Sequence, residues 1–216
     1  PQDPINDVGI LFIETSGCLP MCGHGLIGAL TILLEEELIK PKTEGEVRVE
    51  TPAGLVIANY HRRGAKIESV KFTNVPAFLV ASSIEIICPD LGALNIDVAY
   101  GGNFYAIIES QKNYFGLKNY RAEELISFSR EIRDKINKKY ANRFIHPIDK
   151  SIRDVSHILW TGQVLDNESS SRNAVFYGNK AIDRSPCGTG SSARMAQLFS
   201  QNKLKVGEAF IHESYI

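Results

Sequence analysis

The sequence predicts an α+β protein that contains many strands and few long helices. Strand-like segments dominate residues 46–108, where β-branched and aromatic residues alternate with polar ones. Only three segments of the chain place apolar residues at helix spacing. In addition, two C-G-x-G loops, at Cys22 and Cys187, each stand directly before one of these helical segments. We therefore expect two related halves, residues 1–98 and residues 99–216.

The expected strands begin near the start of the chain. Residues 8–14 (VGILFIE) form a short apolar strand, and the turn-forming residues of segment 16–20 indicate a loop after it. Four strand segments follow in residues 46–108, with Gly, Pro or Asn at the breaks between them. Two further strands are expected at residues 155–165 and 174–182. Most of the chain is therefore expected to lie in sheets.

The three expected helices differ in character. Residues 26–40 (LIGALTILLEEELIK) are mostly apolar and end before Pro41. Residues 121–140 form a charged amphipathic helix, and residues 191–201 (SSARMAQLFSQ) form a shorter one. Because the first and third helices follow the C-G-x-G loops, the cysteine of each loop is expected at a helix N-terminus.

The composition excludes several classes of protein. The formal net charge is −1, so the basic excess of a nucleic-acid-binding protein is missing. No apolar run approaches the roughly 18 residues of a membrane span, and the first residues have neither the charged nor the apolar part of a signal peptide. We expect a cytoplasmic protein that binds neither nucleic acid nor membranes. The cytosol would keep its cysteines reduced, and they are too few for a disulfide scaffold: Cys18, Cys22, Cys88 and Cys187.

A cysteine at the start of a helix is suited to acid/base chemistry. The first backbone N–H groups of a helix are unpaired, and the helix dipole adds partial positive charge there. Such a place binds anions and favours a thiolate, so we expect the pKa of Cys22 and Cys187 to fall from about 8.5 toward neutrality. Flanking glycines let a substrate carboxylate approach the main chain. Two such thiols on opposite faces of an amino acid would invert its Cα without any cofactor or metal.

Three segments resemble the signatures of the proline racemase family, which includes the hydroxyproline 2-epimerases. They are MCGHG at residues 21–25, YGGNF at residues 100–104 and DRSPCGTG at residues 183–190, and their order along the chain is that of the family. The resemblance implies a diaminopimelate epimerase-like fold of two similar halves. Each half would be a curved, mostly antiparallel sheet or barrel around a central helix, with the site in the cleft between them. Chains of the family are longer at both ends, so the first half is expected to lack its N-terminal start and the second its C-terminal return segment.

The resemblance also implies a role for each residue of the site. Cys22 and Cys187 are the two acid/base residues, main-chain N–H groups beside them hold the substrate carboxylate, and an aspartate accepts a hydrogen bond from the ring nitrogen. His157 stands where the hydroxyproline epimerases carry a histidine, and Tyr177 makes the pocket more polar. This favours an imino acid with a hydroxyl group, with trans-4-hydroxy-L-proline inverted to cis-4-hydroxy-D-proline. A homodimer is also expected, and the substrate-binding residues are expected to be Gly23, His24, His157, Asp183, Gly188 and Thr189.

Several alternatives stay open at the level of sequence. Proline itself could be the substrate, and His157 could be a strand histidine that binds no ligand. In a different class, Cys22 and Cys187 could pair as a regulated disulfide of a redox or non-catalytic protein. The 3-hydroxyproline dehydratase branch is disfavoured, because a threonine replaces the second cysteine there. A dinucleotide loop at residues 23–28 lacks the strand context that it needs, and a metal site on Cys18, Cys22 and His24 lacks a second pair of ligands.

Overall fold

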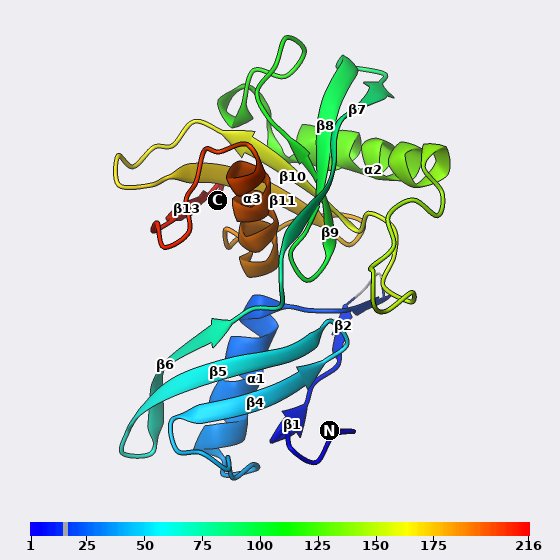
Figure 1. Ribbon diagram of the computed structural model, residues 1–216. Helices are drawn as coiled ribbons and strands as arrows, with labels where there is room; N and C mark the ends of the chain where they lie inside the picture. The colour runs from blue at the N-terminus through cyan, green and yellow to red at the C-terminus, as the bar shows by residue number, and fades with distance from the viewer. Residues whose placement is uncertain (15–16) are drawn as a thin grey trace. The chain divides into compact units, whose positions relative to one another are not determined.

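The computed structural model describes residues 1–14 and 17–216, and its chain forms two compact units, Pro1–Pro76 and Ala77–Ile216 (Figure 1). This division differs from the one expected between residues 98 and 99, which falls inside strand β8 (Gly92–Tyr100). The physical reason is that β8 pairs with a neighbouring strand on each side, so the expected division would cut through one sheet.

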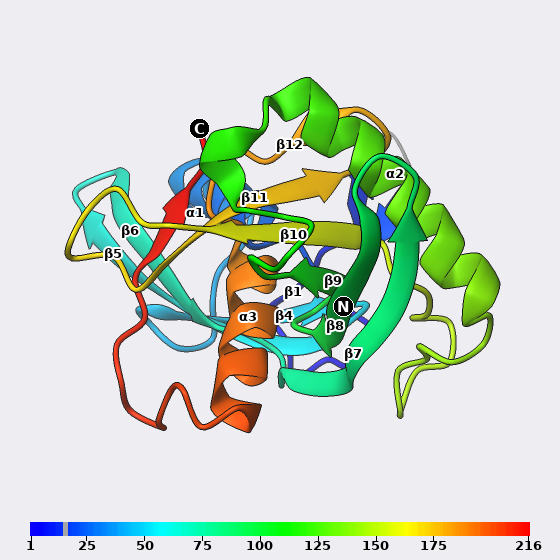
Figure 2. The ribbon, with the colours of Figure 1, turned by 90° about the horizontal axis from the view of Figure 1, so that it is seen from above.

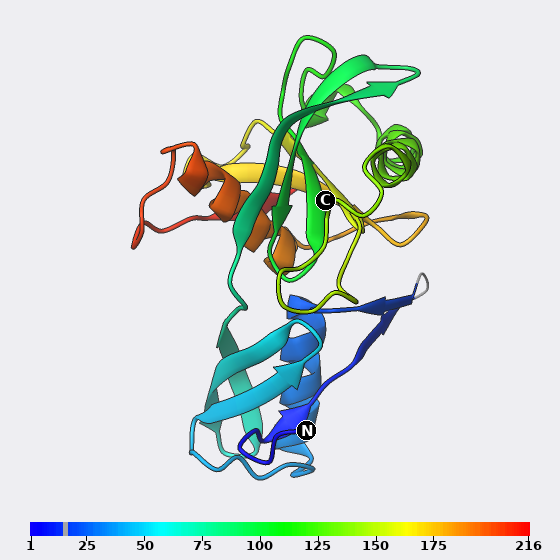
Figure 3. The same cartoon turned by 45° about the vertical axis from the view of Figure 1, so that its right-hand side comes forward.

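The first unit consists of a four-stranded sheet, a short hairpin and one helix. The strand order of the sheet is β1-β4-β5-β6; β1 runs parallel to β4, and the other neighbours are antiparallel. Strands β2 and β3 form the separate hairpin that leads into α1, and α1 lies along the sheet and contacts β6 (Figure 3). The elements are β1 (Val8–Gly9), β2 (Phe12–Glu14), β3 (Gly17–Leu19), α1 (Gly23–Glu35), β4 (Glu46–Thr51), β5 (Gly54–Arg63) and β6 (Lys66–Thr73).

Helix α1 buries one apolar stripe against the sheet. Leu26, Leu30 and Leu34 recur every four residues and are buried, as are Val47 and Val49 of β4. In β4 these buried residues alternate with half-buried ones, which is typical of a sheet with one face on a core. The apolar helix expected from the sequence is therefore confirmed. It begins earlier than expected, at the glycine after the first cysteine, so the C-G-x-G loop forms its first turn. It also ends earlier, at Glu35 and not before Pro41, because Glu37 has a positive φ of 52° that does not continue a helix.

The strand expected over residues 8–14 is divided into two. Its first part, β1, pairs with β4, whereas its second part, β2, pairs with β3. The loop expected at residues 16–20 begins on Ser16, which lies outside the described residues, and its described part carries strand β3. The change of pairing partner between β1 and β2 explains why one apolar segment makes two strands.

The second unit contains a larger mixed sheet with helices on both faces. The strand order is β12-β11-β10-β9-β8-β7, and β13 pairs with β11. Pairs β9–β10 and β11–β13 are parallel, and the others are antiparallel. Helices α2 and α3 cover opposite faces (Figures 2 and 3). The elements are β7 (Phe78–Cys88), β8, β9 (Phe104–Ile108), the 3-10 helix η1 (Leu117–Asn119), α2 (Ala122–Lys139), β10 (His157–Gly162), β11 (Ser171–Tyr177), β12 (Ala181–Ile182), α3 (Gly188–Ser200) and β13 (His212–Ser214).

The central strands β9 and β10 are buried on both faces because a helix covers each face. Tyr105 and Ile107 of β9 belong to one core cluster with Ala193 of α3. On the other face, Trp160 of β10 is fully buried, and its Nε1 donates to Ser129 Oγ of α2 at 2.8 Å. This arrangement accounts for the nearly continuous apolar sequence of these two strands.

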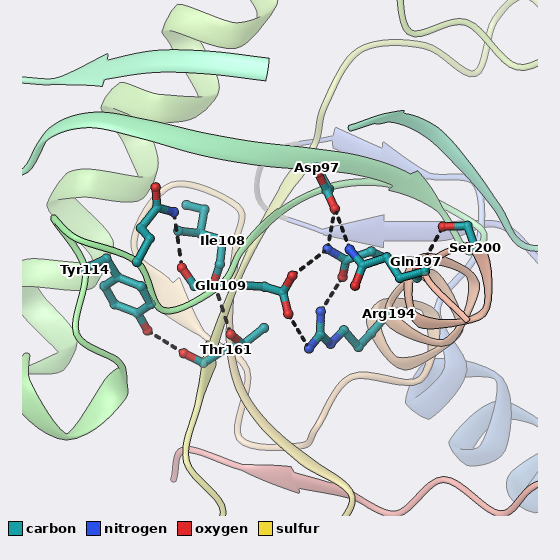
Figure 4. Close-up of polar contacts among 10 residues, drawn as sticks. Asp97, Ile108, Glu109, Tyr114, Thr161, Arg194, Gln197 and Ser200 are labelled. Atoms are coloured by element: carbon teal, nitrogen blue, oxygen red, sulfur yellow. Dashed lines mark hydrogen bonds and ion pairs between the residues drawn. The ribbon is translucent and has the colours of Figure 1, made fainter. Parts of the chain in front are cut away.

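A buried polar network anchors the C-terminal half of α3 to the sheet (Figure 4). Gln197 is fully buried and donates from Nε2 to Asp97 Oδ2 on β8 at 2.7 Å. Arg194 Nη2 donates to Glu109 Oε1, just beyond β9, at 2.8 Å. Because a buried amide or charge without a partner is costly, these contacts hold α3 at one position along the sheet. They therefore also determine where the N-terminus of α3 lies.

The α+β class expected from the sequence is confirmed. The charged helix expected at residues 121–140 is α2, and the one expected at 191–201 is α3. The sheets of the described residues are open sheets and not closed barrels. Across residues 1–14 and 17–216, none of the helices has the length and apolar character that crossing a membrane requires.

Candidate active site

The loop before α3 is shaped by a chain of hydrogen bonds that begins at Asp183. The carboxylate of Asp183, which is almost fully buried, accepts the backbone N–H and the hydroxyl of Ser185 on Oδ1, each at 2.9 Å. The hydroxyl oxygen of Ser185 in turn accepts the backbone N–H of Cys187 at 3.0 Å. Cys187 is the N-cap of α3 and has a φ of 63°, a conformation that non-glycine residues rarely adopt. The hydrogen bonds from Asp183 onward thus hold the cysteine in a strained conformation.

A second set of contacts fastens this loop to strands β11 and β13. Asn173 Nδ2 of β11 donates to Pro186 O at 2.7 Å. Ser191 Oγ, in the first turn of α3, lies 2.7 Å from His212 Nδ1 of β13. Burial, and to a smaller degree the charge of Arg194, lowers the pKa of His212 to about 4, so this histidine is neutral at pH 7. Contacts with strands β11 and β13 therefore fix the position of the loop that carries Cys187.

The thiol of Cys187 lies against two hydroxyl groups. Tyr105 Oη is 3.2 Å from Cys187 Sγ and 2.6 Å from Thr189 Oγ1, and the thiol is 3.8 Å from that threonine oxygen. Burial raises the pKa of Cys187 to about 11; Asp183 acts in the same direction, and the hydrogen bond from Tyr105 acts against it. The fall in pKa that we expected from the helix N-terminus is therefore wrong for this cysteine, because desolvation outweighs the groups that favour the thiolate.

His157 lies beside the same tyrosine. It begins strand β10, is 5% exposed, and its ring centroid is 4.8 Å from that of Tyr105. Its Nδ1 is 2.7 Å from Ser156 Oγ. Burial, and secondarily Arg133, lowers the pKa of His157 to about 3, so the ring is neutral. The structure thus brings together four residues that the sequence singled out in the second unit: His157, Asp183, Cys187 and Thr189.

The YGGNF segment supports α3 directly. A β-carbon added to Gly101 would stand 2.2 Å from Thr189 O and 2.5 Å from Ala193 N, so only glycine allows the first turns of α3 to approach this closely. Asn103 Nδ2 of the same segment donates to Thr189 Oγ1 at 3.3 Å. The motif is therefore the platform on which the second cysteine loop is built.

The first unit contains the other cysteine loop. Cys22 is the N-cap of α1, with an extended backbone (φ −141°), and is half-buried. Gly23 is buried, and the side chain of His24 is exposed. The carbonyl oxygen of Cys22 accepts the backbone N–H of Leu26 at 2.9 Å, as that of Cys187 accepts the N–H of Ser191 at 2.8 Å in the second unit. Both loops therefore continue directly into their helices.

The last glycine of each C-G-x-G loop lies under the thiol of its own cysteine. A β-carbon on Gly25 would come 3.2 Å from Cys22 Sγ, and one on Gly190 would come 3.3 Å from Cys187 Sγ. The two C-G-x-G loops therefore share the position of a glycine next to the thiol, although the backbone conformations of the two cysteines differ. Each glycine leaves room for a thiol above the first turn of a helix.

Two further cysteines lie outside both C-G-x-G loops. Cys18 is exposed and Cys88 is buried. Within the described ranges, no three His, Cys, Asp or Glu side chains gather as metal ligands would. Sequence reasoning missed the roles of Tyr105, Ser185 and His212 at the second loop. The first two adjoin or lie inside the recognised motifs, which is the one signal that could have found them; His212 carries no such signal.

Several known proteins are similar to this chain in sequence or in structure. A 4-hydroxyproline 2-epimerase from Spirosoma linguale is 57% identical over 216 residues, which are 100% of this chain and 64% of that protein. A crystal structure of a probable proline racemase from Agrobacterium radiobacter K84, with bound carbonate, has 30% identity and a TM-score of 0.88 over 100% of this chain and 63% of that one. A hydroxyproline epimerase from Agrobacterium vitis, with bound trans-4-hydroxy-L-proline, has 28% identity and a TM-score of 0.87 over 99% of this chain and 61% of that one.

The length of the sequence match shows to which family the chain belongs. The sequence model of the proline racemase family matches residues 1–216, so the agreement is not confined to the short motifs around the cysteines. The chain spans about two thirds of the length of the relatives that it matches, 64% for the Spirosoma protein. From its loops, its fold and this match, we conclude that the chain belongs to the proline racemase family.

Proposed function

We propose that this protein is a cofactor-independent isomerase that inverts Cα of trans-4-hydroxy-L-proline to give cis-4-hydroxy-D-proline. The observation that carries the proposal is the pair of C-G-x-G loops, each of which places a cysteine at the N-cap of a helix above a glycine of its first turn. The relative with 57% identity bears the name of this activity, which supports the choice of substrate.

The proposed mechanism uses the two thiols in opposite roles. One thiolate removes the proton from Cα, and the other cysteine, as a thiol, protonates the opposite face. Backbone N–H groups at the two helix starts would bind the substrate carboxylate and stabilise the negative charge that grows on it. These groups belong to Gly23 and His24 in one loop and to Gly188 and Thr189 in the other.

The raised pKa of Cys187 supports the proposal that this residue starts as the thiol. It would then be the proton donor in the direction in which Cys22 starts as the thiolate. In the reverse direction the roles exchange, since each transfer leaves the partner cysteine in the opposite form. Asp183, next to this loop, is the proposed acceptor for the ring nitrogen of the substrate.

His157 is the proposed source of selectivity for the hydroxylated substrate. Its ring is neutral and nearly fully buried, and its Nδ1 is already engaged by Ser156 Oγ. The hydroxyl group of the substrate would therefore be bound by Nε2. A buried polar group that loses its partner is costly, so a site built for a hydroxyl group discriminates against proline.

Incorporation of deuterium tests the proposal. The reduced protein is incubated in deuterated water with trans-4-hydroxy-L-proline or L-proline, and label at Cα is followed by NMR. We expect label and inversion with the hydroxylated substrate and a lower kcat/KM with proline. Absence of exchange with both imino acids, with thiols shown to be reduced, would exclude the proposal and favour a redox role.

Replacement of His157 tests whether this residue gives the enzyme its selectivity for hydroxyproline over proline. His157→Leu keeps an apolar volume in β10 and removes the hydrogen-bonding group, so we expect kcat/KM to fall more for hydroxyproline than for proline. An equal fall for both substrates would remove His157 from the explanation of selectivity. The homodimer, the cytoplasmic location and the two-half arrangement of the site stay predictions, and sedimentation of the purified protein tests the first of them.

A further inference from the structure

The proposed reaction makes two opposed demands on Cys187. Its thiol must donate a proton in one direction, and its thiolate must accept one in the other. Burial favours only the thiol. A neighbour that hydrogen-bonds to both forms, and more strongly to the charged thiolate, would meet both demands.

Tyr105 has the position that such a neighbour needs. Its hydroxyl oxygen is 3.2 Å from Cys187 Sγ and 2.6 Å from Thr189 Oγ1. The side chain is fully buried, in the core cluster that β9 forms with α3, and its ring lies against that of His157. Packing on both sides therefore holds the phenol oxygen still relative to the thiol.

The hydroxyl groups can serve both forms of the cysteine by rotating their hydrogens. Beside a thiolate, Tyr105 donates to Sγ, and Thr189 donates to the phenol oxygen. Beside a thiol, S–H donates to the phenol oxygen, and Tyr105 donates to Thr189. Thr189 Oγ1 also accepts from Asn103 Nδ2, at 3.3 Å, in both cases. Every hydroxyl keeps one hydrogen, and no heavy atom has to move.

We infer that Tyr105 is a positioning residue for Cys187, which holds the thiol and the thiolate at one place by reversing its hydrogen bond. The consequence for catalysis rests on the proposed function, whereas the hydrogen bond to the thiolate does not. The phenol itself is not an acid in the reaction, because burial holds the pKa of Tyr105 well above its usual value. The proton in transit passes only between Cα and Sγ.

Alkylation of Cys187 tests the inference without reference to activity. Trypsin cleaves after Arg184 and Arg194 and releases residues 185–194, in which Cys187 is the single cysteine, so mass spectrometry follows this thiol alone. Tyr105→Phe keeps the ring and removes the donor. Since only the thiolate reacts, we expect iodoacetamide to modify Cys187 about tenfold more slowly at pH 8.

Tyr114→Phe is the matched control. Tyr114 is also fully buried in the second unit, but its hydroxyl donates to Thr161 O at 2.7 Å and not to the thiol. We expect normal alkylation of Cys187 in this variant. An unchanged rate in Tyr105→Phe, or equal slowing in both variants, overturns the inference.

Steady-state kinetics then tests the catalytic consequence. In Tyr105→Phe we expect kcat to fall about tenfold in both directions, the alkaline limb of its pH profile to move upward, and KM to change little. Slowed alkylation in a protein whose wild type shows no exchange at Cα would support the hydrogen bond and exclude the proposed function. The two claims therefore fail separately.

A labelled wild-type protein covers the case in which Tyr105→Phe does not fold, as judged by circular dichroism. 3-Fluorotyrosine in place of tyrosine makes the phenol a stronger donor and leaves the chain otherwise intact. We expect faster alkylation of Cys187 at pH 8 than in the unlabelled protein. No acceleration overturns the inference.

Discussion

Both C-G-x-G loops place a cysteine at the N-cap of a helix, but the two cysteines differ in backbone conformation and in the residues around them. Each cysteine precedes a helix of 13 residues, and each has a glycine under its thiol. Cys22 has an extended backbone, and the histidine two residues after it is exposed. Cys187 has a strained backbone and lies against Tyr105 and Thr189, and Ser191 in the first turn of its helix contacts a partly buried histidine.

The comparison separates the position of a thiol, which depends on the local sequence, from its pKa, which depends on the sheet that buries it. The position of each thiol next to the first turn of its helix depends on a glycine three residues after the cysteine, so both loops share it. The proton affinity of Cys187 comes mainly from burial by the sheet of the second unit, which is built from segments far away in the sequence. The local motif therefore does not by itself determine the pKa of the Cys187 thiol.

The largest expected effect follows from removal of either thiol. In Cys22→Ser and in Cys187→Ser we expect inversion to fall by about 10²- to 10⁴-fold, because a hydroxyl group is too weak an acid to replace a thiol. Chiral chromatography of the imino acid measures it. Exchange of the Cα proton from one enantiomer is expected to survive in each variant, with the opposite preference in the two.

Cys18→Ser is the control, because this cysteine is exposed and outside both loops. We expect it to retain activity. Substantial inversion by either loop variant would contradict the symmetrical roles of the two cysteines.

Gly101→Ala should break the second loop and leave the first intact. Its β-carbon would collide with backbone atoms of α3 at 2.2 and 2.5 Å, and backbone cannot move aside as a side chain can. We expect the second unit to lose about 3 kcal/mol or more of stability. Urea unfolding followed by the fluorescence of Trp160, the single tryptophan, reports on this unit. A stable Gly101→Ala protein would refute the close approach of YGGNF to α3.

As the pH falls, we expect the loop around Cys187 to lose stability before the loop around Cys22. The pKa of His212 is about 4 and that of His157 about 3 in the folded chain, compared with about 6.5 when unfolded. Between these values the unfolded chain binds protons that the folded chain does not, so stability is present above pH 6.5 and is lost as the pH falls toward 4. Each pKa unit corresponds to about 1.4 kcal/mol.

Hydrogen exchange at pH 7 and pH 5 measures this difference, after correction for intrinsic rates. We expect residues around Cys187 to lose protection at the lower pH and residues around Cys22 to keep it. His212→Asn should reduce the pH dependence. Equal loss of protection in both loops would show that the buried histidines do not control the second one.

The smallest expected effects come from the glycines under the thiols. In Gly25→Ala and Gly190→Ala the new β-carbon would press on the thiol at 3.2 and 3.3 Å, and we expect kcat/KM to fall about tenfold in each. Gly28→Ala, in α1, is the matched control, since its β-carbon would meet nothing within 4 Å. It should stabilise the helix by about 0.5–1 kcal/mol and leave kcat/KM unchanged. A tenfold loss in Gly28→Ala as well would attribute the effect to the helix and not to the thiol.

The sequence by itself determined the α+β class, the three main helices and the two cysteine loops. These features depend on short-range patterns: the spacing of apolar residues along a helix, and glycines next to a cysteine. The YGGNF and DRSPCGTG segments could be matched to family signatures from the sequence, because all their informative residues are adjacent in the chain.

The tertiary structure alone decided how those segments are used. It divided residues 8–14 between two pairing partners, moved the boundary of the units to Pro76–Ala77, and gave Cys187 a raised pKa. It also placed Tyr105, which lies 82 residues away in sequence, beside that thiol. Strand pairing and burial depend on which distant segments meet, and a local pattern does not contain that information.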